Sequence, residues 1–514
     1  MQAKPQQSYR LFSIQQIQML ERNAKADRHQ PSLMELAGKA IFSQALALIK
    51  PDQGPVLLIA GPGNNGGDAL EAAAHLSAAG YKTDLIRLGQ DATRSPEAQL
   101  ALNKALHSPI QQLPADASLV PSTDQLAYQL IVDGLFGIGL NKPITDATAQ
   151  LAFRINQYAA QTGCPVLAID VPSGLHAETG AIVGGAAGCC IAATHTLSLI
   201  GNKPGLHTGD GKQLAGQVLL DDLQLAAVAH SEYVACLTDP AQIDCHALSR
   251  KANTHKGSFG DVAIIGAAPG MAGAGILAAR AALFAGAGRI FLVQPDAELR
   301  LDMLHPEIMC RDARQFEFNK QVIVIGPGLG QDQLAIDLLR AALQHTCPVV
   351  IDADALNLLA AKPELAAQLK TRTATTLLTP HPLEAARLLA LSTEQVQQNR
   401  AAAARELAQR FDCHIILKGA GSILCGPQDR HYRINPSGNP GLASGGTGDV
   451  LAGLCGALLA QGMEVGDAAA LACWAHGAAA DELVMAGSGP IGLHASELLP
   501  VIRSLLNRKV AGRI

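Results

Sequence analysis

Hydrophobic and polar positions follow a regular order along the first 200 or so residues of the chain. Short apolar runs, each about the length of a buried strand, alternate with longer alanine-rich segments whose apolar residues recur at helical spacing. The runs are VLLIA, TDLIRL, LIVDGLFG, PVLAIDVPSG and THTLSLIG. Strands that alternate with helices in this way predict a parallel, doubly wound sheet.

Two helical patterns precede the first of these strands. They are SIQQIQMLERNA and SLMELAGKAIFSQALALI, and the second begins with Ser32 and Glu35 directly after Pro31. A serine followed three residues later by a glutamate is the spacing of a capping box. The sequence therefore predicts a helix that starts at about residue 33.

A second series of strand-like and helical segments fills the rest of the chain. The pattern weakens between Asp221 and Arg250, and the new series starts at HKGSFGDVAIIGAAPGMAGA. It continues through VIVIGPGLG, VVIDADAL, TLLTPHPLE, IILKGAGSIL and NPGLASGGTGDVLAGLCGALLAQG. We place the domain boundary near residue 225, which gives domains of residues 1–224 and 225–514. The motifs of the two halves do not repeat, so the domains are expected to be unlike.

The composition supports this fold class and limits the choice of ligand. The 514 residues are 48% hydrophobic, 16% charged and 3% aromatic, with 50 glycines, which is typical of an α/β protein rich in tight turns. A formal net charge of −5 gives no electrostatic support for a nucleic-acid partner. We expect a small-molecule ligand.

The cysteines and the apolar segments indicate the cellular compartment of the protein. The 11 cysteines are scattered, apart from the adjacent Cys189 and Cys190, and no C-x-x-C pair occurs. We interpret them as free thiols in a reducing compartment. The N-terminal residues lack the apolar run of a signal peptide, and the long uncharged stretch Val262–Ala279 is broken by Pro269 and by glycines. We expect a cytoplasmic protein without a membrane span.

The turn GPGNNGGD, residues 61–68, raises the first question about function. It contains G-x-G-x-x-G between a strand and a helix, and Asp84 follows at about the spacing of a ribose-binding acid. This pattern favours an NAD-dependent dehydrogenase. However, the turn adds asparagines and an aspartate where a pyrophosphate needs bare backbone N–H groups, and Asp84 lies inside a strand.

Oxygen-bearing side chains gather at three predicted strand ends of the first domain. Because the ends of parallel strands meet at one edge of the sheet, these residues are expected to share a crevice. Amide, hydroxyl and carboxylate oxygens suit a hard cation, although each such residue alone also suits a turn or a helix cap. The residues are Asn64, Asn65, Asp68, Asp133, Asp170 and Ser173.

The motifs GPGNNGGD, VDGLFGIGLNKP and AIDVPSGL together resemble the N-terminal domain of the NAD(P)H-hydrate repair proteins, the NAD(P)HX epimerase, which has a Rossmann-like fold. The resemblance implies potassium at Asn65, Asp133 and Ser173. It also implies that the turn holds a hydrated nicotinamide dinucleotide as substrate. The implied NAD(P)HX contacts are Asn64, Asn65, Gly66, Gly67, Asp68, Gly137, Ile138, Gly139, Leu140, Asn141, Lys142, Pro143 and Asp170.

Epimerisation at carbon 6 of the nicotinamide ring requires a positioned acid or base, whether by proton transfer or by reversible opening of the hemiaminal. We choose Asp170 as this catalytic group. Lys203, in GNKPG, could assist with charge, but a lysine flanked by glycine and proline is expected to be an exposed loop residue.

The strongest motif of the second half is GGTGDVLAG, residues 445–453, where a glycine-rich turn runs into an apolar helix. Its N–H groups and the helix dipole would form an anion hole, and Asp449 could reach a substrate hydroxyl or simply cap the helix. G-x-G-D before an apolar helix is characteristic of ribokinase-like enzymes, in which the aspartate deprotonates the accepting hydroxyl.

Together with HKGSFGDVAIIGAAPGMAGA, TPHPLEAARLL and LKGAGSIL, this motif looks like the ADP-dependent NAD(P)HX dehydratase, a ribokinase-like family. The resemblance implies NAD(P)HX contacts at Ala274, Gly328, His381 and Asp449. It implies that the adenine nucleotide lies at Lys418, Gly419, Ala420, Gly421, Ser422 and Gly448. Phosphorylation of the 6-hydroxyl, with Asp449 as base, would create a good leaving group, and Mg²⁺ is expected on the phosphates. His476 and Trp474 are interpreted as packing residues.

The preferred hypothesis is therefore a bifunctional enzyme that epimerises R- and S-NAD(P)HX and dehydrates the S form with ADP to give AMP and phosphate. A small-molecule kinase fused to a binding domain is an alternative, but it leaves NNGGD and DVPSG unexplained. A nucleotide sensor that only binds is another. The sequence does not decide between NADHX and NADPHX, or between ADP and ATP. We expect a homo-oligomer, because many domains of these two classes associate.

Overall fold

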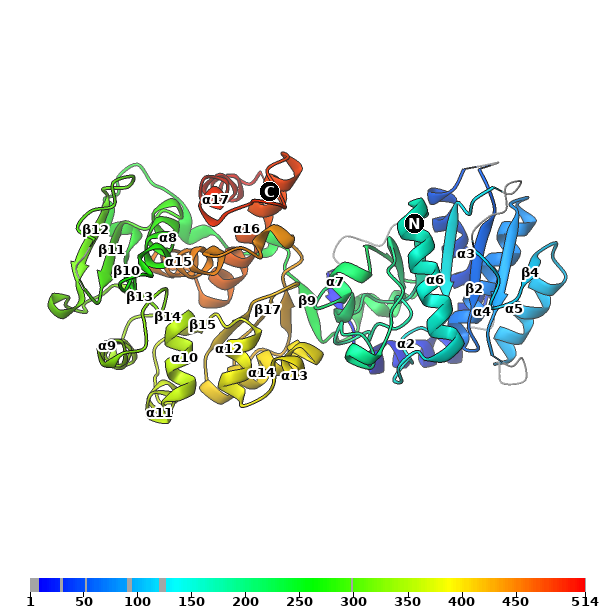
Figure 1. The fold of residues 1–514 in the computed structure, drawn as a ribbon, viewed down its shortest axis with the longest axis horizontal. Helices are drawn as coiled ribbons and strands as arrows, with labels where there is room; N and C mark the ends of the chain where they lie inside the picture. Colours follow the sequence, from blue (N-terminus) through cyan, green and yellow to red (C-terminus); the bar gives the residue numbers. More distant parts are fainter. Residues whose placement is uncertain are drawn as a thin grey trace. The chain divides into compact units, whose positions relative to one another are not determined.

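The computed structural model describes residues 9–27, 31–50, 53–89, 95–119, 126–296 and 299–513. The chain divides into two compact units, residues 1–236 and 237–514 (Figure 1). Both units are α/β, as the sequence predicts.

Parallel strands form the sheet of the first unit, in the order β4-β3-β2-β5-β6-β7-β8. The strands are β2 (Val56–Ala60), β3 (Thr83–Arg87), β4 (Gln111–Leu113), β5 (Leu130–Gly134), β6 (Val166–Ile169), β7 (His195–Leu199) and β8 (Gln217–Asp221). A short strand, β1 (Arg10–Leu11), pairs antiparallel with β9 (Ala235–Leu237). The order reverses between β2 and β5, which is where doubly wound sheets form their ligand crevices.

Helices cover both faces of this sheet. They are α2 (Ile14–Asp27), α3 (Leu33–Leu48), α4 (Asn64–Ala78), α5 (Pro96–Leu106), α6 (Asp146–Thr162) and α7 (Gly211–Leu214). Leu58 packs on the α3–α4 side, whereas Leu57 and Ile59 pack on the α6 side. The strand β2 is buried on both faces, which explains why it is a continuous apolar run. The capping box at Ser32 and Glu35 is confirmed.

The second unit has a parallel sheet with the same kind of reversal. Its strands run in the order β18-β17-β16-β15-β14-β13-β10-β11-β12, with β16, β17 and β18 paired antiparallel. The strands are β10 (Asp261–Ile265), β11 (Arg289–Gln294), β12 (Ile308–Asp312), β13 (Val322–Ile325), β14 (Val349–Ile351), β15 (Thr376–Leu378), β16 (His414–Leu417), β17 (Ile423–Cys425) and β18 (Tyr432–Ile434). The order reverses between β10 and β13.

The helices of the second unit are α8 (Ala272–Phe284), α9 (Gln333–Gln344), α10 (Ala353–Ala361), α11 (Pro363–Lys370), α12 (Pro382–Leu389), α13 (Thr393–Gln398), α14 (Arg400–Phe411), α15 (Thr447–Ala460), α16 (Val465–Met485) and α17 (Ala495–Val510). Helices α8 and α15 pack against each other and against the strands around β10 (Figure 1). The stretch Val262–Ala279 is a strand, a loop and a helix, as predicted.

The division between the units falls later than the predicted boundary near residue 225. Leu223, Leu225 and Val228 are buried in the same hydrophobic core as Leu58 of β2. The segment in which the sequence pattern weakens therefore belongs, up to Cys236, to the first unit.

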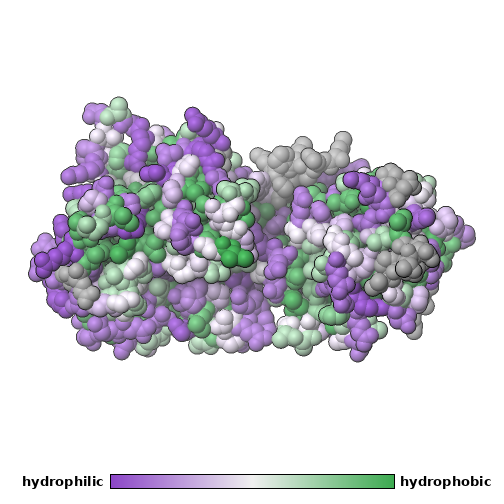
Figure 2. Space-filling model, turned by 45° about the horizontal axis from the view of Figure 1, so that its top comes forward, coloured by the Kyte–Doolittle hydropathy of each residue, from purple (hydrophilic) through white to green (hydrophobic). Residues whose placement is uncertain are grey.

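No described helix is long and apolar enough to cross a membrane. Hydrophilic residues cover much of the face shown in Figure 2, and apolar residues are interspersed among them.

Candidate active sites

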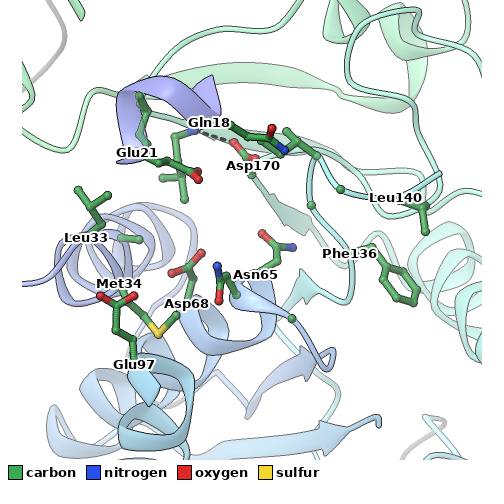
Figure 3. Close-up of a pocket in the computed structure, with 18 of the residues that line it drawn as sticks. Gln18, Glu21, Leu33, Met34, Asn65, Asp68, Glu97, Phe136, Leu140 and Asp170 are labelled. Carbon is green, nitrogen blue, oxygen red and sulfur yellow. Dashed lines mark hydrogen bonds between the residues drawn. The ribbon is translucent and has the colours of Figure 1, made fainter. Parts of the chain in front are cut away.

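A cavity of about 560 Å³ lies where the strand order of the first sheet reverses. The turn after β2, the loop after β5 and the residue after β6 all contribute to its wall, and helix α2 lies on another side (Figure 3). Its position at the carboxyl ends of three parallel strands is the one predicted from the polar residues at those strand ends.

Most of the sequence-predicted residues of this domain line the cavity directly. The lining includes Asn64, Asn65, Asp68, Gly137, Ile138, Gly139, Leu140, Asn141, Lys142 and Asp170. Gly66, Gly67 and Pro143 are not part of the lining. Gly66 instead packs against the strand end, because a Cβ there would lie 2.0 Å from the carbonyl oxygen of Gly61.

Asp133 and Ser173 are fully buried beneath the cavity. One Asp133 carboxylate oxygen accepts from the Ser173 hydroxyl at 2.6 Å, and the other accepts from the Ser173 backbone N–H at 2.8 Å. Burial raises the pKa of Asp133 to about 6, although these hydrogen bonds act in the opposite direction. In the described part of the chain, no cationic side chain forms an ion pair with this carboxylate.

Asn65 is also buried, and a Cβ on Gly134, the residue after Asp133, would lie 3.0 Å from the Asn65 carbonyl oxygen. Its Nδ2 has no hydrogen-bond partner among the described residues. A Cβ on Gly137 would lie 3.3 Å from the Asn65 Oδ1 atom, so the loop after β5 approaches the amide closely. A buried carboxylate without a cation, together with amide and hydroxyl oxygens, is a donor set that fits a potassium ion.

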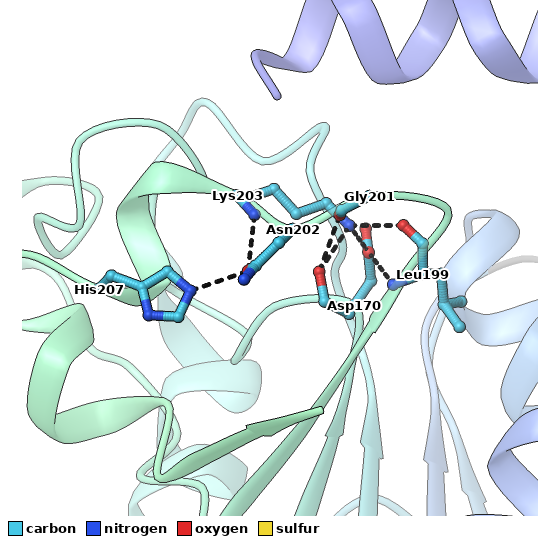
Figure 4. A network of polar contacts seen from close by, with 7 residues as sticks. Asp170, Leu199, Gly201, Asn202, Lys203 and His207 are labelled. Carbon is cyan, nitrogen blue, oxygen red and sulfur yellow. Dashed lines mark hydrogen bonds and ion pairs between the residues drawn. The ribbon is translucent and has the colours of Figure 1, made fainter. Parts of the chain in front are cut away.

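Asp170 is held by a network of buried contacts (Figure 4). The Lys203 ammonium donates to the Asp170 carboxylate, to the Ser198 hydroxyl at 3.1 Å and to the Leu199 carbonyl at 2.9 Å. The Leu199 backbone N–H donates to the same carboxylate at 3.1 Å. Asp170 also has a φ of 68°, a left-handed conformation that is uncommon for aspartate and costs stability unless the surroundings fix it.

The prediction that Lys203 is an exposed loop residue is wrong. Its side chain is 0% exposed and pairs with Asp170. Glycine and proline neighbours do mark a loop here, but that loop folds back over the end of β7. A buried lysine is costly without a partner, so its charge is compensated by the carboxylate.

Helix α2 adds residues to the cavity that the sequence reasoning missed. Gln18, Glu21 and Lys25 line it, and they share one helix face because they are three and four residues apart. Burial and then the charge of Asp170 raise the pKa of Glu21. Burial, followed by the charges of Asp170 and Glu21, raises the pKa of Asp68 well above its ordinary value.

Asp84 takes no part in this cavity. It lies in β3, and its carboxylate accepts a hydrogen bond of 2.9 Å from the Tyr128 hydroxyl. A carboxylate engaged inside the sheet in this way is not the ribose-binding acid of a dehydrogenase.

The second unit brings its glycine-rich loops together where its own strand order reverses. The loop after β10 bonds to the loop after β13, because the Ala268 N–H donates to the Gly328 carbonyl at 2.7 Å. Gly328 has a φ of 59°, and a Cβ there would lie 3.2 Å from the Cβ of Ala274. Two of the predicted NAD(P)HX contacts are therefore neighbours in space.

The Lys418 ammonium lies near the start of α15, the helix that contains Asp449. A Cβ on Gly448 would lie 3.3 Å from the Lys418 Nζ atom. The same ammonium donates to Asp352 Oδ1 at 2.6 Å. Burial and the charge of Asp352 raise the pKa of Asp449 to about 7. The sequence analysis did not select Asp352, although it follows the strand VVI directly, at the strand end where the other functional residues lie.

His381 is the N-cap of α12. Its Nδ1 accepts from the N–H groups of Leu383 at 3.1 Å and Glu384 at 3.4 Å. Burial and the charge of Lys418 lower its pKa, so the neutral form is favoured. Burial raises the pKa of the neighbouring Glu384 to about 7. His381, which lies between Pro380 and Pro382, is therefore fixed by this capping geometry.

A buried arginine, Arg400, donates hydrogen bonds to the backbone at the start of the loop Lys418–Ser422. Arg400 is 1% exposed, and its guanidinium donates to the carbonyls of Leu417 at 3.3 Å and Lys418 at 3.2 Å. Gly419 has a φ of 143°, and a Cβ there would lie 2.7 Å from the guanidinium. The Ser422 hydroxyl donates to the Gly419 carbonyl at 3.2 Å.

Further observations concern the packing residues, the cysteines and metal-binding groups. Trp474 and His476 are buried in α16, as predicted for packing residues. All the cysteines are free. Within the described ranges, no group of three or more His, Cys, Asp or Glu side chains could hold a metal ion.

Family models match both units. The YjeF-related protein N-terminus model matches residues 30–205, and the NAD(P)H-hydrate dehydratase model matches residues 262–502. The chain therefore combines an N-terminal YjeF-related domain with a C-terminal NAD(P)H-hydrate dehydratase domain.

Full-length relatives have the same arrangement. The chain is 38% identical to the bifunctional NAD(P)H-hydrate repair enzyme Nnr of Vibrio cholerae over 96% of this chain and 98% of that protein. It is 36% identical to the Escherichia coli protein of the same name, over 94% of this chain and 90% of that one. The chain belongs to the family of bifunctional NAD(P)H-hydrate repair enzymes.

A solved structure is similar to part of the chain. It is the ADP/ATP-dependent NAD(P)H-hydrate dehydratase of Bacillus subtilis, co-crystallised with ATP and Mg²⁺. It is 29% identical, with a TM-score of 0.45, over 51% of this chain and 94% of that one.

Proposed function

We propose that the chain repairs hydrated nicotinamide nucleotides in two steps. The first unit interconverts R- and S-NAD(P)HX, and the second dehydrates S-NAD(P)HX with ADP, giving NAD(P)H, AMP and phosphate. Family membership supports the pairing of the two activities. The observations that carry the proposal are the buried Asp170–Lys203 pair at the end of the first sheet and, in the second unit, Asp449 with its raised pKa at the start of α15, near Lys418 and Asp352.

In the first unit we assign Asp170 as the base that accepts a proton from the substrate. The buried Lys203 ammonium pairs with its carboxylate, which keeps the carboxylate in place at the end of β6. The cavity would hold the dinucleotide against the Asn64–Asp68 turn and the loop Gly137–Lys142. The proposed contacts at Gly66, Gly67 and Pro143 would act through the backbone shape of these segments.

Potassium is proposed at Asn65, Asp133 and Ser173. The buried Asp133 carboxylate, which lacks a cation among the described residues, is the observation that favours it. A bound cation would neutralise this charge and fix the Asn65 turn against the loop after β5.

In the second unit Asp449 would accept the proton of the 6-hydroxyl group. The hydroxyl oxygen would then take the terminal phosphoryl group of ADP, and the phosphate would leave with the C6–O bond pair as a proton is lost from C5. Lys418 lies where it would neutralise the transferring group, and the N–H groups at the start of α15 would receive its oxygens. Ala274, Gly328 and His381 would contact the substrate, and residues 418–422 and Gly448 would contact the nucleotide.

Magnesium is proposed on the phosphates of the nucleotide. Because no group of three or more described His, Cys, Asp or Glu side chains could hold a metal ion, the phosphates and water would provide most of its ligands. When bound, the ion would offset phosphate charge. A cytoplasmic location, a homo-oligomeric state and the absence of nucleic-acid and membrane partners stay predictions.

The two activities are tested separately on purified hydrates. S-NADHX with ADP and Mg²⁺ is expected to give NADH together with AMP and phosphate, and Asp449→Asn is expected to abolish this. R-NADHX without ADP is expected to convert to the S form, and Asp170→Asn is expected to abolish that conversion. Phosphate transfer to another alcohol, without NADH formation, would show a kinase instead.

A further inference from the structure

We propose that Glu21 of helix α2 is a second catalytic group of the epimerase, the acid that protonates the nicotinamide ring nitrogen while Asp170 accepts the proton of the 6-hydroxyl. This inference rests on the proposed epimerase function of the first unit. Helix α2 lies before residue 30, where the match to the N-terminal family model begins.

Geometry is the first support. Glu21 lines the cavity together with Asp170 and Asp68. Figure 3 shows Glu21 and Asp170 on one side of the cavity, with Asn65 and Asp68 facing them. A substrate ring held between these walls would have one carboxyl group near its hydroxyl and another near its nitrogen.

The contrast between the two carboxyl groups is the second support. Asp170 is anchored by Lys203 and by the Leu199 N–H. Among the described residues, Glu21 has neither a hydrogen bond nor an ion pair, and Lys25 on the same helix is paired with Glu97 at 3.2 Å. A carboxyl group paired with an ammonium, beside an unpaired carboxyl group in a shared cavity, is the usual arrangement of a base and an acid.

The surroundings of Glu21 raise its pKa above the ordinary value. Burial and the neighbouring Asp170 raise its pKa, and Lys203 and Lys25 act in the opposite direction. Asp68 faces it from α4 and is itself favoured in the neutral form. Because Lys203 is engaged by Asp170 and Lys25 by Glu97, neither provides a direct partner that would hold Glu21 ionised.

Asp170 and Glu21 alone can accept and donate the protons that ring opening and ring closure require. Asp170 takes the proton of the 6-hydroxyl, the C6–O bond becomes a carbonyl, and the C6–N1 bond breaks. Its electron pair moves to N1, which receives the proton of Glu21. Rotation about the C5–C6 bond presents the other face of the aldehyde, and the reverse steps close the ring and return both protons to their starting groups.

The direct test is Glu21→Gln in the full chain, assayed for conversion of R- to S-NADHX. The amide keeps the shape but has no acidic proton, so kcat is expected to fall by about 10²–10⁴-fold with KM unchanged. Dehydration of S-NADHX by the same preparation should stay at the wild-type rate, which controls for folding. Arg22→Gln changes the neighbouring, exposed residue of α2 and should leave both activities unchanged.

Chemical rescue separates an acid from a structural residue. Glu21→Ala should regain epimerase activity in formate or acetate, because a small carboxylic acid can occupy the space of the lost side chain. Oxygen-18-enriched water tests the route, since ring opening leaves the 6-oxygen in place whereas loss of hydroxide exchanges it at every epimerisation.

Several results would overturn the inference while leaving the proposed function intact. They are a Glu21→Gln enzyme with wild-type kcat, one in which only KM rises, no rescue by formate or acetate, or exchange of the 6-oxygen at each turnover. If the wild-type chain does not interconvert the hydrates at all, the proposed function fails instead.

Discussion

At the scale of single residues, the sequence predicts where the candidate site residues lie in the fold. It predicts less well what surrounds them. Asn65, Asp133, Asp170 and Ser173 lie at strand ends, so their convergence follows from parallel topology. Lys203 could not be placed, because its burial depends on a loop that closes over β7. Glu21 shows only helical spacing, which a surface helix would share.

If Asp449 is the base of the dehydratase, as proposed, its pKa determines how dehydration responds to pH. A base must be ionised to accept a proton, and burial together with Asp352 raises the pKa of Asp449 to about 7. We therefore expect kcat/KM for S-NADHX to fall as the pH decreases through about 7. Asp352→Asn removes a nearby negative charge and should shift this limb of the pH–rate profile to lower pH. A limb that does not move would contradict the assigned coupling.

The proposed potassium site at Asp133 can be tested by thermal unfolding. A cation bound beside this buried carboxylate should stabilise the folded first unit, so KCl is expected to raise its Tm relative to LiCl at equal ionic strength. Asp133→Asn should abolish the difference between the two salts. Asp84→Asn is the matched control. Asp84 lies in the same sheet but bonds to Tyr128, so this variant should keep the Tm difference between the two salts. Equal Tm values for the wild type in both salts would argue against a potassium site.

At the scale of elements, the order of strands and helices was predictable because each strand is a distinct apolar run between turn residues. β2 and the capping box of α3 lie where the sequence predicts them. The segment up to Cys236 was not assigned to the first unit from the sequence. Leu223, Leu225 and Val228 are too few apolar residues to show a helix or strand period. Their burial comes from the first unit's core.

Gly66 is required by the turn between β2 and α4. A Cβ at this position would lie 2.0 Å from the Gly61 carbonyl oxygen, whereas a Cβ on Gly139 would meet nothing within 4 Å. Gly66→Ala should therefore lower the free energy of unfolding of the first unit by about 1–3 kcal/mol. Thermal unfolding measures this loss, and Gly139→Ala should leave stability unchanged. Equal stabilities for the two variants would show that the turn relaxes freely.

Arg400 supports the loop Lys418–Ser422. Arg400→Met leaves the buried carbonyls of Leu417 and Lys418 without their donor, which should cost about 1–3 kcal/mol. We expect a lower urea midpoint for the second unit and a higher KM for ADP. Arg340→Met is the control, because Arg340 pairs with Asp337 on an exposed helix face and such pairs contribute little. A change in KM without loss of stability would place Arg400 in a different role.

At the scale of the whole molecule, two doubly wound units each place chemistry where their strand order reverses. The fusion has a chemical logic, because a dehydratase that accepts only the S hydrate leaves the R hydrate unrepaired. Family membership, the Asp170–Lys203 pair of the first unit and the raised pKa of Asp449 in the second unit support this division of labour. Asp170 is therefore assigned to epimerisation and Asp449 to dehydration, two steps of one repair sequence.

The most direct test is the yield of NADH from an equilibrated mixture of R- and S-NADHX with ADP, Mg²⁺ and K⁺. The wild type should convert nearly all of the mixture, and Asp449→Asn should convert none. Asp170→Asn should convert the S fraction rapidly and then stall. Full conversion by Asp170→Asn at the wild-type rate, or NADH formation by Asp449→Asn, would contradict the assignment of the two sites.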